Sequence, residues 1–230
     1  MSDKTSLRAR GARRLVLSLA IIAWFLFVPA RSLHFWQAWL FLALTAVFWI
    51  SSQLYFLKHD PELVARRLQN KEAQPQQRLF QKLWSLILPI SFVLAGLDFR
   101  LGWSRHWLGP VPLAGVLAGD AMVLAGYTLV FWVMKTNTFA ASTIQVEAEH
   151  RVIDTGPYAV VRHPMYTGMT MTALATPFAL GSYIAAPAFA LIVPVLIFRL
   201  IHEEKTLRRD LPGYAEYCER TRKRLVPFVW

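Results

Sequence analysis

The sequence contains a single cysteine, Cys218, among its 230 residues. One cysteine excludes an intrachain disulfide and a metal cage built from cysteines. Charged residues make up only 17% of the chain, against about 25% in an average soluble domain. The sequence also lacks the Walker, GxGxxG, HExxH and GxSxG motifs. This absence excludes the common soluble nucleotide folds, hydrolases and zinc sites that those motifs mark.

Hydrophobic residues are abundant, at 55%, and they gather in six apolar segments. Each segment can cross the roughly 30 Å hydrocarbon core as a helix, whereas a sheet edge would leave backbone groups unsatisfied in lipid. We therefore predict an all-α, polytopic membrane protein with five or six transmembrane helices and a cytoplasmic C-terminal helical tail; merging the short segments gives five. The last two segments should form a tight hairpin at Gly181-Ser182, kinked by Pro177, Pro187 and Pro194. The segments are 15–30, 36–57, 83–97, 111–134, 165–180 and 183–200.

Basic residues are distributed unevenly between the connections. With six spans, 22 of the 25 Lys and Arg residues lie on one side, and only Arg31, Arg100 and Arg105 lie on the other. The positive-inside rule then predicts a multi-pass membrane protein with both termini cytoplasmic. The net charge of +11 indicates anionic membrane lipids as partners, and no nucleic acid. The sequence leaves the oligomeric state open.

The connection 59–82 starts with Asp-Pro-Glu at 60–62, a signal for the beginning of a helix. We expect Leu63, Val64 and Leu68 of this helix to rest on the membrane surface, with Arg66 and Arg67 pointing away from it. The tail should also be helical, with a break at Pro212-Gly213.

Two polar clusters adjoin apolar segments on the predicted cytoplasmic side. The first, residues 150–166, ends where the segment 165–180 begins, and Pro164 suits the first turn of that helix. Exposed N–H groups there could receive an anionic ligand group. In the second cluster Arg199 and Glu203 are four residues apart and share a helix face. A purely structural turn would account for the first cluster as well, and an interfacial salt bridge would account for the second.

A third candidate is Asp120, inside the apolar segment 111–134. An intramembrane carboxylate is a functional candidate by default. However, Gly115, Gly119 and Gly126 around it indicate close helix packing, in which Asp120 is simply paired.

The polar clusters resemble a known family signature. The motifs are HRVI at 150–153, GPY at 156–158, RHPMYTG at 162–168, and Arg199 with Glu203-Glu204. Together with the tail, they are similar to those of isoprenylcysteine carboxyl methyltransferases, and phospholipid N-methyltransferases look similar over the same region. Bacterial members also resemble the chain at 60–63 and 96–98, and this resemblance implies the bacterial inner (plasma) membrane as its location. The resemblance favours a division into transmembrane helices at 1–134, with an interfacial connection at 59–82, and a catalytic region at 135–230, which holds a cofactor loop, the hairpin and the tail.

The resemblance implies an S-adenosylmethionine-dependent methyltransferase embedded in the membrane. It assigns catalytic roles to Arg199, which would face the methyl acceptor, and to Glu203. The family has Gln seven residues before the first motif His, where this chain has Thr143, so Gln145 takes that place with a shift of two residues. The residues that the resemblance implies for cofactor binding are Gln145, His150, Arg151, Val152, Ile153, Tyr158, His163, Pro164, Met165, Tyr166 and Glu203.

The methyl acceptor is expected to be lipid-soluble, and a carboxylate is favoured. A carboxylate is ionised at neutral pH and needs no general base, so Arg199 would only have to orient it for O-methylation. An amine or thiol acceptor would require proton removal, for which His163 or His202 could serve, and this N- or S-methylation stays open. The sequence is also compatible with a sterol-reductase-like enzyme that uses NADPH and, less well, with a non-catalytic membrane protein. We expect no metal.

Overall fold

The computed structural model describes residues 2–68, 75–137, 152–227 and 229–230. Within these ranges all regular structure is helical, which confirms the predicted all-α class. The helices are α1 (Ser2–Ala30), α2 (Trp36–His59), α3 (Pro61–Leu68), α4 (Pro75–Leu101), α5 (Trp103–Trp107), α6 (Leu113–Thr136), the 3-10 helix η1 (Gly156–Ala159), α7 (Pro164–Ala179), α8 (Ala186–Ala190), α9 (Ile192–Asp210) and α10 (Tyr214–Arg220).

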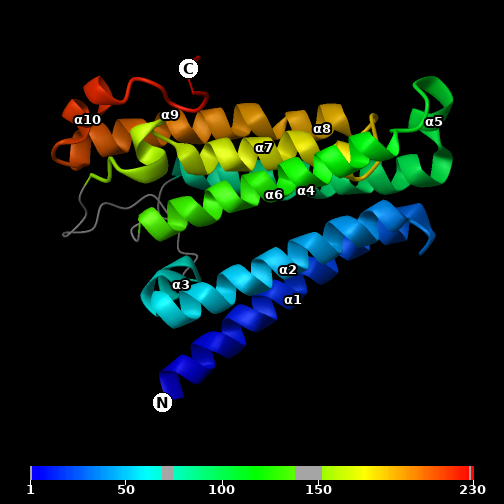
Figure 1. Cartoon of the computed structure of the whole chain (residues 1–230), viewed down its shortest axis with the longest axis horizontal. Coiled ribbons are helices and arrows are strands. Elements are labelled where there is room, and N and C mark those ends of the chain that lie inside the picture. The colour runs from blue at the N-terminus through cyan, green and yellow to red at the C-terminus, as the bar shows by residue number, and fades with distance from the viewer. Residues whose placement is uncertain (1, 69–74, 138–151, 228) are drawn as a thin grey trace.

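Five stretches of these helices are long and apolar enough to cross a membrane, as expected of a multi-pass integral membrane protein. The predicted segment 165–180 forms α7, whose 16 residues extend about 24 Å, less than the hydrocarbon core. It nevertheless lies along α6 and α9 (Figure 1). The five stretches are Ser6–Ala30, Trp36–His59, Arg78–Leu101, Leu113–Thr136 and Ala186–Asp210.

The long helices run back and forth along one axis of the molecule (Figure 1). Helix α1 packs against both α2 and α4, α4 packs against α9, and α6 packs along α7. As a result the N-terminus, α3 and α10 lie at one end of the molecule, whereas α5 and the turn between α7 and α8 lie at the other. The two ends therefore separate the connections in the way that the charge pattern predicts.

Small residues let α6 and α7 approach closely, as predicted. A Cβ atom added to Gly119 would lie 2.5 Å from the backbone nitrogen of Ala179, and one on Gly126 would lie 2.6 Å from the carbonyl oxygen of Gly168. The expected pairing of Asp120 is not seen: this side chain is buried, and neither carboxylate oxygen has a hydrogen-bond partner in the described part of the chain.

The predicted hairpin turns where expected, but its second arm is two helices. Gly181 adopts a φ of +69° at the turn, and the Ser182 hydroxyl donates to the buried Asp98 carboxylate at 2.5 Å. Helix α8 then ends at Ala190 and α9 begins at Ile192. Leu191 between them keeps helical backbone angles, so this interruption is the predicted kink. It occurs here because Pro194 has no N–H to donate to the carbonyl of Ala190.

The predicted start of α3 is confirmed, because the Asp60 carboxylate accepts a hydrogen bond from the Leu63 N–H at 2.9 Å. The predicted surface position is wrong for Leu63, which is fully buried. Val64, Arg67 and Leu68 are half-buried and line a cavity between α3 and the neighbouring helices. Helix α3 contacts α1 and α2, so it docks on the bundle.

The C-terminal tail has the predicted break. Helix α9 continues to Asp210, and Gly213 then takes a φ of +79° immediately before α10. Because this left-handed conformation favours glycine, the change of direction is placed there. Tyr217 and Cys218 of α10 pack into a small apolar cluster with Val152 and Tyr158, which joins the tail to the segment before α7.

Candidate functional site

The start of α7 and the tail run side by side at the end of the molecule that holds α3. The N–H groups of Arg162 and His163 donate to the carbonyls of Lys223 and Arg224, both at 2.9 Å. Pro164 then opens α7, where a missing N–H has no cost. The tail backbone therefore fixes the position at which α7 begins.

A buried carboxylate, Glu204, holds this junction together. It accepts from Arg162 Nε at 2.6 Å and from Arg224 Nε at 2.9 Å, and His163 Nε2 lies 3.3 Å from it. The terminal nitrogen Nη1 of Arg162 donates to the carbonyls of Thr221 and Arg222, both at 2.9 Å. Since Arg162, His163 and Glu204 are each 5% exposed, these partners compensate charges that would otherwise be costly to bury.

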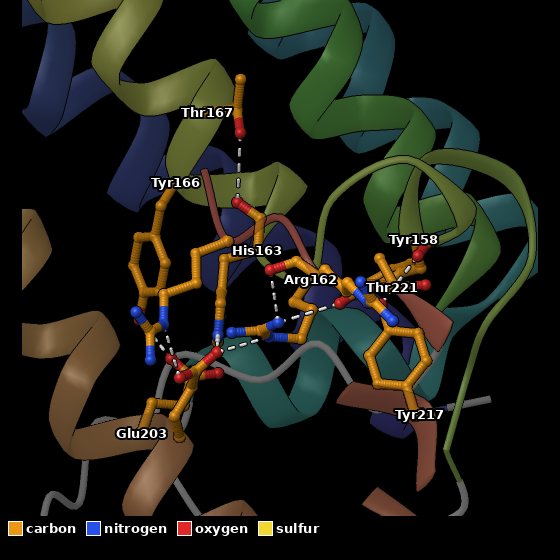
Figure 2. Close-up of polar contacts among 11 residues, drawn as sticks. Tyr158, Arg162, His163, Tyr166, Thr167, Glu203, Tyr217 and Thr221 are labelled. Carbon is orange, nitrogen blue, oxygen red and sulfur yellow. Dashed lines mark hydrogen bonds and ion pairs between the residues drawn. The ribbon is translucent and has the colours of Figure 1, made fainter. Parts of the chain in front are cut away.

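A second carboxylate, Glu203, has different partners one step around the helix. The hydroxyl of Tyr166 donates to Glu203 and accepts from Arg199 Nε, the latter at 2.9 Å (Figure 2). The Arg199 guanidinium also lies over the ring of Phe80 from α4, 4.4 Å from its centre. Tyr166 therefore links the two residues to which the sequence assigns catalytic roles, and Glu203 remains partly exposed.

The 3-10 helix η1 adds a third set of contacts. Tyr158 accepts a hydrogen bond on its hydroxyl from Asn137 at 3.0 Å, and its carbonyl accepts one from the Tyr217 hydroxyl at 2.7 Å. Burial raises the pKa of Tyr158 to about 12, so its hydroxyl keeps its proton at neutral pH. These contacts connect the end of α6 to α10 through η1.

The predicted site residues fall into three groups. Gln145, His150 and Arg151 lie outside the described residues. Tyr158, Tyr166, Arg199 and Glu203 gather at one end of the bundle, and the 5.8 Å between the His163 and Tyr166 ring centres puts those rings side by side. The third group has apolar side chains: Val152 packs with Tyr158 against α10, Pro164 opens α7, and Ile153 and Met165 are half-buried beside them in sequence.

Several residues that build the site are missing from the sequence-based prediction. Glu204 and Arg162 stand inside the quoted motifs, but nothing in their spacing showed that they would pair with each other and with Arg224. Asn137 and Tyr217 hold Tyr158 from positions 21 and 59 residues away. A signal did exist for Glu204, because adjacent residues on a helix point to different faces and a second carboxylate needs partners of its own.

In this arrangement the partly exposed Glu203 carboxylate and the Arg199 guanidinium are both hydrogen-bonded to the Tyr166 hydroxyl. Glu203 can receive a cationic ligand group, and Arg199 can orient an anionic one. The described residues contain no group of three or more His, Cys, Asp or Glu side chains that could hold a metal ion. The chemistry that this end of the molecule can support therefore brings a cation and an anion together beside Tyr166.

Comparison with known proteins points to membrane methyltransferases. Residues 114–211 match the family model described as phospholipid methyltransferase, a range that runs from α6 to the end of α9 and contains Tyr158, Tyr166, Arg199 and Glu203. Protein-S-isoprenylcysteine O-methyltransferase B of Arabidopsis thaliana is 29% identical over 161 residues, which cover 66% of this chain and 77% of the plant protein.

Two further relatives differ in name and in kind. The cobalt-zinc-cadmium resistance protein CzcN of Cupriavidus metallidurans is 27% identical over 144 residues, and this chain spans 60% of its length. The structure of the eukaryotic intramembrane Ras methyltransferase ICMT superposes with a TM-score of 0.56 at 20% identity, over 95% of this chain and 75% of that one. This structural likeness extends the shared fold to the N-terminal helices.

Proposed function

The chain belongs, through residues 114–211, to the phospholipid methyltransferase and isoprenylcysteine carboxyl methyltransferase family, and from this premise we propose that it is an S-adenosylmethionine-dependent methyltransferase. Its acceptor is a hydrophobic, lipid-like molecule, methylated on a carboxylate oxygen. The observation that carries the proposal is the junction of Glu203, Tyr166 and Arg199, which offers a cation site and an anion site on one hydroxyl.

The residues of this junction fit the cofactor. When bound, S-adenosylmethionine supplies a methyl group on a positively charged sulfur together with an amino-acid end. Glu203 carries the complementary negative charge and is held in place by Tyr166. Tyr158 is half-buried and close enough to Glu203 for their charges to interact, and its ring offers the aromatic surface that such a cationic ligand favours. Gln145, His150 and Arg151 are expected to complete the binding site.

The acceptor side of the site favours a group that is already ionised. Arg199 is held between Tyr166 and the Phe80 ring, so its guanidinium is oriented before any ligand arrives. The His163 ring faces the buried Glu204, where it serves the junction with the tail. A carboxylate acceptor needs no proton removed and therefore makes no demand on His163.

His202 separates the possible acceptor classes. Its Nδ1 lies 2.8 Å from the Phe198 carbonyl and donates to it, which leaves Nε2 as an acceptor able to take a proton. If the substrate is an amine or thiol, His202→Gln should abolish most of the turnover. If the substrate is a carboxylate, turnover should stay within about threefold of the unaltered protein, because no base is required.

The proposal places the chemistry on the cytoplasmic side of the inner membrane. Of the 25 Lys and Arg residues, 22 belong to the connections assigned to that side, and the cofactor is a water-soluble molecule of the cytoplasm. The acceptor would then arrive laterally from the bilayer, since Arg199 lies at the end of the apolar segment 183–200.

The decisive experiment measures cofactor binding and methyl transfer with the full chain in lipid nanodiscs. Calorimetry should detect binding of S-adenosylmethionine to the protein, and labelled methyl groups should appear in extracted lipids or hydrophobic acids. Glu203→Gln and Tyr166→Phe should each weaken binding about 10- to 100-fold through lost charge-assisted hydrogen bonds. Glu219→Gln, an exposed change on α10, should leave it unaltered.

Three results contradict parts of this proposal. Binding of NADPH in place of S-adenosylmethionine would favour a reductase-like enzyme. Failure to bind either molecule would support a non-catalytic membrane protein. Undiminished affinity in both Glu203→Gln and Tyr166→Phe would show that the cofactor binds elsewhere.

A further inference from the structure

A cavity of about 380 Å³ lies between α1, α2, α3 and α6, apart from the residues assigned to the cofactor. This volume falls near the lower end of the range for small-molecule sites, about 300–1,000 Å³. The walls are mostly aromatic and aliphatic and include Phe48, Phe56 and Phe131. Apart from the α6 side chains, the lining comes from helices outside the range that matches the family model.

The charged side chains among the described residues that line this cavity are all positive. Arg14 from α1 and Arg67 from α3 both line it, and the described lining residues include no Asp or Glu. The two arginines meet at one end, where the Arg14 guanidinium donates to the Arg67 carbonyl at 3.1 Å. Burial lowers the pKa of Arg67, and the charges of Arg14 and Arg199 lower it further. A negative ligand group beside the two guanidinium groups would raise the pKa of Arg67.

The positively charged end adjoins the candidate site. Arg67 is close enough to Arg199 and Tyr158 for their charges to act on it. Met134 of α6 lines the cavity, and three residues further on Asn137 donates to the Tyr158 hydroxyl. An acidic group held at Arg67 would therefore lie beside the residues to which we assign the reaction.

We propose that this cavity binds the methyl acceptor, a single-chain lipid carboxylate whose chain lies among α1, α2 and α6 and whose acidic group lies where Arg14 and Arg67 meet, on the side of Arg199. The small volume suits one chain, the apolar walls suit its methylenes, and the guanidinium forks suit a carboxylate. Calling this ligand the acceptor rests on the proposed function, whereas the binding does not. The N-terminal helices then select the acceptor, and residues 114–211 hold the cofactor.

The test measures binding of radiolabelled palmitate to the full chain in phosphatidylcholine nanodiscs, without S-adenosylmethionine. Palmitate should bind saturably with one molecule per chain. Hexadecanol has the same chain length but no charge, so it should bind at least about tenfold more weakly.

Two variants and two matched controls locate the site. Arg14→Gln removes one of the charges, and Ser52→Phe fills the apolar part of the cavity; each should weaken palmitate binding about tenfold or more. Arg13→Gln and Ser51→Phe change exposed neighbours on the same two helices and should leave affinity unaltered. Arg14→Gln keeps the test decisive if Ser52→Phe fails to fold.

Equal palmitate affinity in Arg14→Gln and Arg13→Gln would overturn the proposal, because the measured binding would then be only partition of palmitate into the surrounding lipid. Equal affinities of palmitate and hexadecanol would also overturn it by removing the recognition of the anion. A protein that binds palmitate but not S-adenosylmethionine would support the lipid site and contradict the proposed function. The opposite result would contradict the lipid site alone.

Discussion

Glu203 and Glu204 are neighbours in sequence with separate tasks in space. Consecutive residues on a helix are about 100° apart, so they cannot share a face. Glu204 turns inward to Arg162 and Arg224, whereas Glu203 meets Tyr166 and stays partly exposed. One carboxylate therefore holds the fold at this end of the molecule, and the other is left for a ligand.

Glu204→Ala should loosen the tail. Removing one partner of a buried ion pair leaves uncompensated charge, a loss of about 3–5 kcal/mol in the free energy of unfolding. The reactivity of Cys218 can report on loosening of the tail, because this thiol is buried in α10. Burial raises the pKa of its thiol, so little thiolate exists at neutral pH and alkylation should be slow in the folded protein. We expect Glu204→Ala to lower the melting temperature and to speed N-ethylmaleimide labelling of Cys218, followed by mass spectrometry.

Lys205→Ala provides the control, since it changes an exposed neighbour on the same helix. It should change neither quantity. Slow labelling of Cys218 that persists in Glu204→Ala would mean that the tail is held without this carboxylate.

The family resemblance predicted Tyr166, Arg199 and Glu203 as site residues, but it did not indicate how they meet. The Tyr166 hydroxyl and Glu203 are 37 residues apart, and their contact depends on how α7 packs beside α9. Helix periodicity describes one helix at a time, so contacts between helices lie beyond it.

At the scale of the elements, hydropathy located the helices because long apolar runs are nearly sufficient for membrane spans. The predicted start at 36 and the predicted ends at 30 and 180 agree with α2, α1 and α7 to within one residue. The docking of α3 was not predictable, because a short amphipathic helix has the same pattern whether it faces lipid or protein. The separation of α8 from α9 reflects a proline placed where the chain could otherwise continue.

The contact between α6 and α7 should tolerate no added carbon at Gly119. Gly119→Ala would place its Cβ 2.5 Å from the Ala179 backbone nitrogen, and backbone cannot move aside as a flexible side chain can. Overpacking of this kind costs about 1–3 kcal/mol, more than the gain of up to about 1 kcal/mol from better helix propensity. Thermal unfolding in detergent should therefore show a lower melting temperature.

Gly115→Ala, four residues earlier on α6, is the matched control. Its nearest contact would be a Val111 side-chain carbon at 3.2 Å. This variant should be as stable as the unaltered protein or slightly more stable. If both variants behave alike, the close approach of α6 to α7 does not decide stability.

At the scale of the whole molecule, one end collects α3, the start of α7 and α10 (Figure 1). The same end carries the pairs that join Arg162, Glu204 and the tail, and the positive end of the cavity. The opposite end carries Asp98, which accepts hydrogen bonds from Ser104 and Ser182 and so joins α4, α5 and the turn between α7 and α8. Charge counting predicted which connections share an end without any knowledge of these contacts.

The predicted orientation can be tested with single cysteines on a Cys218→Ser background. Leu33→Cys lies in the exposed connection between α1 and α2, and Thr155→Cys lies exposed just before η1. A membrane-impermeant maleimide should label Leu33→Cys in intact cells and should label Thr155→Cys only after permeabilisation. Labelling of Thr155→Cys from outside would invert the orientation and remove the cytoplasmic setting of the proposed reaction.

Arg162 has a consequence for how this protein can diverge. Its guanidinium bonds to the backbone carbonyls of Thr221 and Arg222, and its own N–H bonds to that of Lys223. Carbonyls are the same whatever side chain follows, so mutations at 222 and 223 should accumulate freely across related proteins. Arg162 and Glu204, in contrast, contact each other through their side chains, so substitutions at these two positions should occur together in related proteins. The contacts of Arg162 therefore constrain the length and backbone path of the tail far more than its amino-acid sequence.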